Sequence, residues 1–350
     1  MPSTPLRLLA IDVGAGTQDI LIYESGQPIE NCAKLVLPSP TRIVAARIHR
    51  ATERGRPVYL AGNLMGGGPS TEAIRAHLNA GLPVYAAPEP ARTVHNDLDH
   101  VRSLGIAICE TPPVGAEIIR LGDIDLAAIS ATLRAFEVEP PMRYAVAIQD
   151  HGYQPGVDSH ALRYAFLRSL LRNGGDVLDM AFLEPPPFML RMQAVQRALP
   201  GAVIMDTGAA AVLGVLADPV VARAVADGGA IVVNIGNMHT FGVAVRGRRI
   251  YGLFEHHTGG ISSELLGELV ERLRGGRLTH DEVLRLGGHG AAFNPRYGLD
   301  GDFALVAITG PNRERARGLG YYEAVPHGDM MLAGPYGLVE ATLGLLRGRD

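Results

Sequence analysis

The sequence predicts an α/β protein built from two related lobes that face each other across a cleft. A chain of 350 residues with 47 % hydrophobic and 19 % charged residues can bury a large core, and its length suits two domains or one large α/β domain. Apolar strand-like runs alternate with helical patterns along the chain. Two glycine hairpins of one design also lie more than 200 residues apart, one in each half.

The shared hairpin design is an apolar strand, a polar residue, a glycine corner with a threonine, and a second apolar strand. The two copies read LLAIDVGAGTQDILIY (8–23) and AIVVNIGNMHTFGVAV (230–245). A glycine corner lets backbone N–H groups point at an anion, and an aspartate such as Asp12 can hold a hydrated Mg²⁺ ion. Either copy alone is compatible with an ordinary turn, and the second copy favours a phosphate-and-metal site.

The other elements follow in order between turn-forming segments. Their residue patterns predict strand–loop–helix (57–81), a buried strand (143–152), a helix ending at Gly-Gly (158–175), strand–corner–helix (201–218), strands with turns (228–260), an amphipathic helix (261–276), strand–corner–helix (303–322) and a last helix (328–348).

Charge and composition exclude several classes of protein. The net charge of −4 argues against a nucleic-acid partner, and no apolar run reaches the ~18 residues that cross a membrane. The N-terminal segment has no signal-peptide pattern, so we expect a cytoplasmic protein without a membrane partner. Lys34 is the only lysine, which excludes a Walker-type phosphate loop.

Six segments, taken in chain order, resemble the motifs of the superfamily of actin, heat-shock chaperone and sugar-kinase ATPases. They are AIDVGAGTQD, IMDTGAAAVLGVLAD, VNIGNMHTFGV, HHTGGISSELL, VAITGPNRERARGLG and MMLAGPYGLVEA. The resemblance implies an α/β actin-like ATPase fold of two ribonuclease-H-like lobes with an interlobe cleft. Lobe I would span 1–217 with a variable insert at 25–140. Lobe II would span 218–350, with the final helix returning to lobe I.

The resemblance also implies ATP and Mg²⁺ as cofactors, with Asp12 as the metal ligand. The nucleotide-binding residues would be Gly14, Ala15, Gly16, Thr17, Gln18, Gly236, Asn237, Met238, His239, Gly259, Gly260, Gly310, Pro311 and Asn312. Lys34 is a further candidate, because an ammonium suits a terminal phosphate. Asn234 stands where the superfamily has an aspartate, and Pro311 removes one N–H donor from the adenosine corner.

Three residues are candidate catalytic groups. Asp206 follows the strand AVIM and is either a base for the attacking nucleophile or a helix cap. Asp150 and His151 end another strand, where ligands gather in α/β sheets, and could bind or deprotonate an acceptor. These groups suit an ATP-dependent phosphotransferase or ATPase acting on an unidentified small molecule. The alternatives are a nucleotide-gated switch or activator of a partner protein, or a nucleotide-binding remnant without turnover.

Glu255 with His239, His256 and His257 combines imidazoles and a carboxylate, which could bind a transition metal. Adjacent strand residues point to opposite faces, so His256 and His257 are not expected to share one ion. A substrate-phosphate or surface role is the favoured alternative. The segment LMGGGPSTEAI (64–74) is either a second anion loop at a helix N-terminus or a hinge.

More narrowly, AIDVGAGTQDIL and NCAKLVLPSPT resemble a small family labelled pyruvate formate-lyase activating enzyme. A radical enzyme of that kind needs three closely spaced cysteines for its cluster. This chain has only Cys32 and Cys109, 77 positions apart. The residues therefore fit the family but exclude the radical activity that its label suggests.

Overall fold

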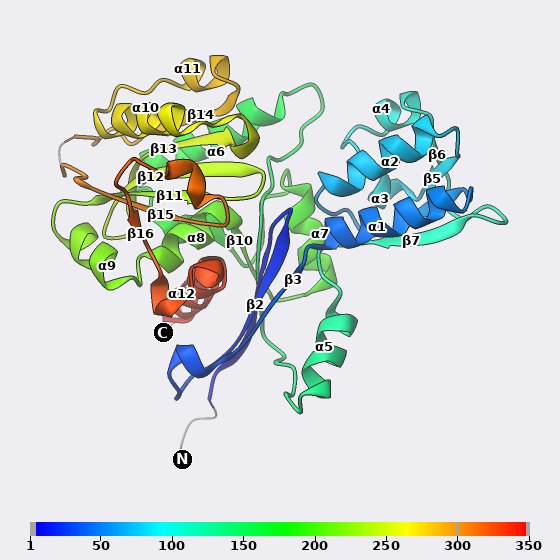
Figure 1. Cartoon of the computed structure of the whole chain (residues 1–350), viewed down its shortest axis with the longest axis horizontal. Helices are drawn as coiled ribbons and strands as arrows, with labels where there is room; N and C mark the ends of the chain where they lie inside the picture. Colours follow the sequence, from blue (N-terminus) through cyan, green and yellow to red (C-terminus); the bar gives the residue numbers. More distant parts are fainter. Residues whose placement is uncertain (1–4, 299–300, 348–350) are drawn as a thin grey trace.

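The computed structural model describes residues 5–298 and 301–347, which form three β-sheets with helices between them (Figure 1). The first sheet has the strand order β3-β2-β1-β8-β10-β9. Strands β1 to β3 form an antiparallel meander, and β8 and β10 continue it in parallel with β1. The bounds are β1 (Arg7–Val13), β2 (Thr17–Glu24), β3 (Ala33–Pro38), β8 (Tyr144–Ile148), β9 (Ala181–Phe182) and β10 (Val203–Asp206).

The second sheet repeats this arrangement with the order β14-β13-β12-β11-β15-β16. Strands β11, β12 and β13 are antiparallel, and β15 and β16 run parallel beyond β11. The bounds are β11 (Ala230–Ile235), β12 (His239–Arg246), β13 (Arg249–His257), β14 (Gly288–Phe293), β15 (Leu305–Thr309) and β16 (Tyr322–Glu323). The common order of meander and parallel strands confirms two ribonuclease-H-like lobes.

Helices cover both faces of these sheets, as parallel strands require. In lobe I the apolar side chains of α5 and α7 pack on one face, and those of α8 and α12 pack on the other. In lobe II the apolar residues of α10 and α11 cover the outer face. The bounds are α5 (Leu126–Ala135), α6 (Ser159–Arg172), α7 (Leu190–Ala198), α8 (Thr207–Val215), α9 (Pro219–Ala226), α10 (Ser263–Arg274), α11 (His280–Arg285) and α12 (Ala333–Arg347).

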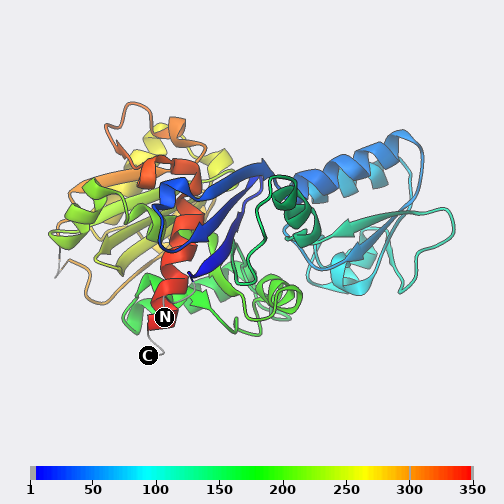
Figure 2. The same cartoon turned by 90° about the horizontal axis from the view of Figure 1, so that it is seen from below.

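Helices α8 and α12 cross closely between the lobes, and glycines permit the approach. A Cβ on Gly214 would lie 1.8 Å from the Ala333 carbonyl oxygen, and one on Gly337 would lie 1.9 Å from that of Ala210. Figure 2 shows the C-terminal helix α12 beside the blue strands of lobe I. Residues of α8 and α12 belong to one hydrophobic cluster with residues of both sheets.

A third, all-parallel sheet of order β6-β5-β4-β7 stands to one side of lobe I (Figures 1 and 2). It comprises β4 (Val58–Gly62), β5 (Val84–Ala86), β6 (Ile106–Ile108) and β7 (Glu117–Leu121), with helices α1 (Pro40–Glu53), α2 (Pro69–Asn79), α3 (Pro88–Ala91) and α4 (Leu98–Ser103). This unit lies within the expected insert 25–140, although β3 and α5 of that range pack with lobe I.

One predicted element differs. The segment after the Gly-Pro-Asn corner forms only a short 3₁₀ turn (Arg313–Ala316) instead of a helix. This stretch is rich in arginine, lacks an apolar stripe, and contains Gly318 and Gly320, which adopt positive φ.

In the described part of the chain, no single helix has the length and apolar composition to cross a membrane. Helices α8 and α9 together satisfy that test by length and composition, but they meet at 92°. Every residue of α8 after Thr207 is buried within the protein.

Candidate functional site

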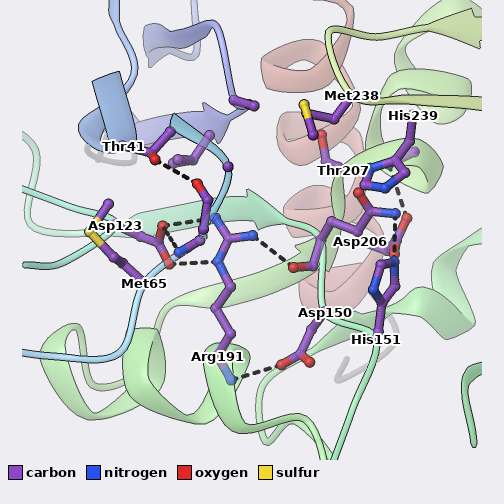
Figure 3. Close-up of a pocket in the computed structure, with 18 of the residues that line it drawn as sticks. Thr41, Met65, Asp123, Asp150, His151, Arg191, Asp206, Thr207, Met238 and His239 are labelled. Carbon is purple, nitrogen blue, oxygen red and sulfur yellow. Dashed lines mark hydrogen bonds and ion pairs between the residues drawn. The ribbon is translucent and has the colours of Figure 1, made fainter. Parts of the chain in front are cut away.

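A cavity of about 370 Å³ opens between the two lobes and the third sheet. The tips of both glycine hairpins, the loop Gly66–Gly68, the end of β8 and the start of α8 all line it. Figure 3 shows Arg191 and Asp123 on one side of the pocket, with His151, Asp206, Thr207 and His239 on the other. Its volume falls within the range of small-molecule sites, about 300–1,000 Å³.

The two hairpin tips are closed in the same way. The Gly14 N–H donates to the Thr17 carbonyl oxygen at 3.0 Å, and the Gly236 N–H donates to that of His239 at 2.9 Å. The tips also touch each other, because a Cβ on Gly16 would lie 2.3 Å from the Asn237 amide nitrogen. The hairpins that the sequence pairs at long range are therefore equivalent in structure and adjacent in space.

Four backbone N–H groups at these tips donate to no acceptor within the described residues. They belong to Ala15, Gly16, Asn237 and Met238. All of these residues except Gly16 line the cavity directly. Free, clustered N–H groups next to a cavity are the typical binding arrangement for phosphate oxygens.

Asp12 and Asp19 face each other across the first hairpin in register. The Thr207 hydroxyl donates to Asp12 Oδ1 at 2.6 Å, and Thr207 itself lines the cavity. Burial raises the pKa of Asp12 to about 7 and that of Asp19 to about 8, and the adjacent Asp12 charge also raises the latter. The buried Asp19 Oδ1 has no hydrogen-bond partner among the described residues. This carboxylate pair with an unpaired oxygen fits a hydrated divalent cation.

Asp206 is both a helix cap and a member of a buried ion-pair network. Its Oδ1 accepts from the backbone N–H groups of Gly208 (3.0 Å) and Ala209 (3.3 Å) at the start of α8. Its Oδ2 lies 2.9 Å from the Arg163 guanidinium, whose Nε donates to Glu255 at 2.8 Å. Burial alone would lower the pKa of Arg163, but the two carboxylates hold it above its usual value. Conversely, burial disfavours ionised Glu255, but Arg163 holds its pKa well below the usual range.

Asp150 caps the start of α7. It accepts from the N–H groups of Gly152 (2.8 Å), Arg191 (2.8 Å) and Met192 (3.0 Å). Arg191 also forms a bidentate pair with Asp123 and donates to the Gln149 carbonyl oxygen, so it joins β8, α7 and the third sheet (Figure 3). Asp150 and His151 both line the cavity, as does Asp206.

Several predicted nucleotide residues lie outside the cavity lining. Lys34 Nζ donates to the Glu30 carbonyl oxygen and lies 5.9 Å from the Tyr336 ring. The side-chain amide of Gln18 donates to Pro38. The adenosine corner packs beneath the second hairpin, because Asn312 Nδ2 donates to the Gly236 carbonyl oxygen at 3.0 Å. The remaining positions outside the lining are Gly16, Thr17, Gly259, Gly260, Gly310 and Pro311.

The predicted histidine group divides in two. His239 and Glu255 line the cavity, and burial lowers the pKa of His239 to about 3. His256 points elsewhere, with its ring nitrogens 2.9 Å from the His257 carbonyl oxygen and 3.0 Å from that of Leu286. His257 instead contacts His289, with 3.1 Å between their Nε2 atoms.

Sequence reasoning missed Arg163, Arg191, Asp123, Gln149 and His289. Arg163 had a readable signal: it lies on the buried face of α6 with Leu167 and Leu170, where an apolar residue is expected. The others lie in segments without a recognisable motif, and only the tertiary fold brings them to the cavity.

Two lobes that share a five-strand order (β3-β2-β1-β8-β10 and β13-β12-β11-β15-β16), matching hairpins and a cavity at the hairpin tips define a protein with the actin-like ATPase fold. Residues 65–315 match the family described as "Putative pyruvate format-lyase activating enzyme (DUF1786)", and the chain belongs to that family. No curated protein matches the chain.

Similar solved structures include the ethanolamine utilization protein EutJ from Carboxydothermus hydrogenoformans (13 % identity, 97 % of this chain and 90 % of that chain, TM-score 0.29). They also include a PilM–PilN type IV pilus biogenesis complex (14 % identity, 97 % of this chain and 99 % of that chain, TM-score 0.37). A third is a Ppx/GppA family member from Aquifex aeolicus (12 % identity, 73 % of this chain and 52 % of that chain, TM-score 0.25). The present chain spans about half the length of that protein. The fold assignment rests on the strand order described above.

The residues do not fit an iron–sulfur cluster of the kind that the family's description suggests. Cys32 precedes β3 and is buried, whereas Cys109 follows β6 in the third sheet. Two cysteines in separate units cannot supply the thiolates of such a cluster.

Proposed function

We propose that the chain binds a Mg²⁺–nucleotide between its two hairpin tips and hydrolyses or transfers the terminal phosphoryl group. The observation that carries this proposal is the meeting of two equivalent glycine corners with four free N–H groups, three of which belong to residues that line one cavity. Such groups stabilise phosphate charge without any lysine, and the single lysine of this chain lies elsewhere.

Asp12 and Asp19 would hold the hydrated Mg²⁺ ion, and Thr207 would orient Asp12 through the hydrogen bond to Oδ1. A bound Mg²⁺ ion would neutralise charge on the phosphates. Gly334 of α12 leaves room for this arrangement, because a Cβ there would lie 2.0 Å from Asp12 Oδ2. The second hairpin would contribute backbone contacts only, since Asn234 replaces a carboxylate.

The acceptor side of the cavity would be the loop Gly66–Gly68. This loop leads into α2, whose N-cap Gly68 provides no side-chain cap. Arg92 and Asn96 line the same side. A helix N-terminus beside polar and cationic side chains suits a small anionic molecule, which supports a small-molecule acceptor for the phosphoryl group.

A nucleotide-gated switch acting on a partner protein is the second candidate. It is favoured by the position of Asp206, whose Oδ1 caps α8 and whose Oδ2 lies at ion-pair distance from Arg163 without a hydrogen bond to it. A carboxylate held in this way is a poor general base, so turnover without a partner would be slow.

The test is a titration of the full-length chain with Mg²⁺–ATP, followed by thermal shift and by calorimetry. We expect a rise in Tm by mass action. Asp12→Asn should weaken Mg²⁺-dependent binding while the apo fold is retained. The matched control is Lys34→Ala, which alters a charge outside the cavity. No Tm rise at millimolar Mg²⁺–ATP, or equal binding by Asp12→Asn and the wild type, would overturn the proposal.

A further inference from the structure

A group of four potential metal ligands lies where the two lobes meet, apart from the Asp12–Asp19 pair. One ligand atom each from His151, His239, Glu255 and His289 lies within 4.8 Å of all the others. His151 follows β8 of lobe I, whereas the other three come from β12, β13 and β14 of lobe II. Three neighbouring strands thus present side chains to a residue of the opposite lobe.

The ligand atoms approach one another at the spacing of a shared ion. Glu255 Oε1 lies 3.2 Å from His289 Nδ1 and 3.7 Å from His151 Nε2. Metal–ligand bonds of about 2.0–2.1 Å in a tetrahedral site place neighbouring ligand atoms about 3.3 Å apart. The fully buried His289 Nδ1 makes no hydrogen bond to any described group despite this closeness. A buried nitrogen that lies near a carboxylate without hydrogen-bonding to it is suited to binding the same metal ion as that carboxylate.

The outer contacts orient these ligands as metal sites require. Arg163 donates to Glu255 Oε2 at 2.8 Å and leaves Oε1 for the ion. The Nε2 atoms of His289 and His257 lie 3.1 Å apart, so a proton on His289 Nε2 leaves the Nδ1 lone pair free. The Gln149 amide donates to both His151 and Glu255 and would turn away when an ion enters.

We propose that His151, His239, Glu255 and His289 bind a divalent first-row transition metal ion that bridges the two lobes. Three imidazoles and one carboxylate favour Zn²⁺, Co²⁺ or Fe²⁺ over Mg²⁺, which prefers an all-oxygen octahedron. This ion is distinct from the Mg²⁺ proposed at Asp12. Since one ligand belongs to lobe I and three to lobe II, its binding holds the two lobes in the arrangement described above.

The experiment uses chelator-treated full-length protein without nucleotide, titrated with Zn²⁺ against a chromophoric chelator and with Co²⁺ by visible absorption. We expect one Zn²⁺ per chain, an intense Co²⁺ d–d spectrum typical of four-coordination, and a Zn²⁺-dependent rise in Tm. His151→Ala should lower the Zn²⁺ affinity at least about tenfold. The His151 side chain is 28 % exposed, so its removal opens no core cavity.

His160→Ala is the matched control, because His160 stacks on His289 at 4.4 Å between ring centroids but is not one of the four ligands. It should keep wild-type affinity within about twofold. Glu255→Gln, with the apo fold checked by circular dichroism, provides a second ligand variant. Asp12→Asn should bind Zn²⁺ as the wild type does, which separates this result from the nucleotide proposal. Absence of stoichiometric Zn²⁺ in the wild type, or equal losses in His151→Ala and His160→Ala, would overturn the inference.

Discussion

Replacing Asp19 by asparagine should make the protein more stable, and increasingly so as the pH rises. Asp19 is buried in the first hairpin opposite Asp12, and its pKa is raised from 3.8 to about 8, first by burial and then by the Asp12 charge. A carboxyl whose pKa is higher in the folded state than in the unfolded chain stabilises the fold below the unfolded pKa. That stability is lost as the pH rises through the folded pKa. The pH range over which Asp19 loses this stabilising contribution therefore extends from about pH 4 to pH 8.

The magnitude follows from the size of the shift. One pKa unit corresponds to about 1.4 kcal/mol, so ionised Asp19 costs at most about 6 kcal/mol well above pH 8 and about 1–2 kcal/mol at pH 5. For a chain of this length, 1 kcal/mol shifts Tm by about 1–2 °C. The advantage of Asp19→Asn over the wild type should therefore grow by about 4–8 °C between pH 5 and pH 8.5.

The assay is thermal unfolding of both proteins in EDTA across this pH range. Asp99→Asn is the control, because Asp99 is an exposed carboxylate of α4 that pairs with Arg102. Added Mg²⁺ should flatten the pH dependence of the wild type and leave Asp19→Asn unchanged, if the carboxylate pair holds the ion. Parallel Tm curves for Asp19→Asn and the wild type would refute the reasoning.

Four further substitutions test the structure. Arg163→Met leaves two buried carboxylates without their cation, so urea denaturation should show a loss of about 3–5 kcal/mol; a loss below about 1 kcal/mol would contradict the network. Gly337→Ala places a Cβ 1.9 Å from a carbonyl oxygen of α8 and should lower Tm, whereas Gly267→Ala meets only a leucine side chain at 3.2 Å and should not. Asp206→Asn should slow single-turnover ATP hydrolysis less than about tenfold; a loss of 10²–10⁴-fold would identify Asp206 as the base. Lys34→Ala should leave the calorimetric Mg²⁺–ATP affinity unchanged, and a clear loss would place Lys34 at the phosphates.

The sequence predicts the lobe architecture because each lobe begins with an apolar hairpin. The glycine corner of such a hairpin is specified by residues that are adjacent in the sequence. The segments around Gly14 and Gly236 predict strands β1–β2 and β11–β12, and the structure confirms both. The edge strand β3 is less visible, because its residues are half-exposed and carry no alternating pattern. Its residues fall within the expected insert 25–140, although β3 pairs with β2 in lobe I.

Only part of the candidate site can be predicted from the sequence, for a physical reason. The hairpin tips are encoded locally by glycine, which the turn and the close contact at Gly16 require. The charged side chains that surround them meet only in the tertiary fold, as when Gln149 donates to Glu255 across 106 positions. His289 lies in a strand of mostly small residues, GHGAAF. The sequence of this strand does not predict that other histidines lie next to His289.

The buried arginine connects the two sites proposed for this chain. Arg163 contacts Asp206 at the start of α8 and Glu255 in the histidine cluster, so one guanidinium compensates carboxylates on both sides. A metal ion bound at Glu255 would weaken the ion pair between Glu255 and Arg163. The Arg163 guanidinium would then interact more strongly with Asp206. Asp206 in turn fixes the first turn of α8, where Thr207 orients Asp12. A metal ion between the lobes and a nucleotide at the hairpin tips would thus act on the same buried charges, which gives the cleft a physical basis for coupling the two ligands.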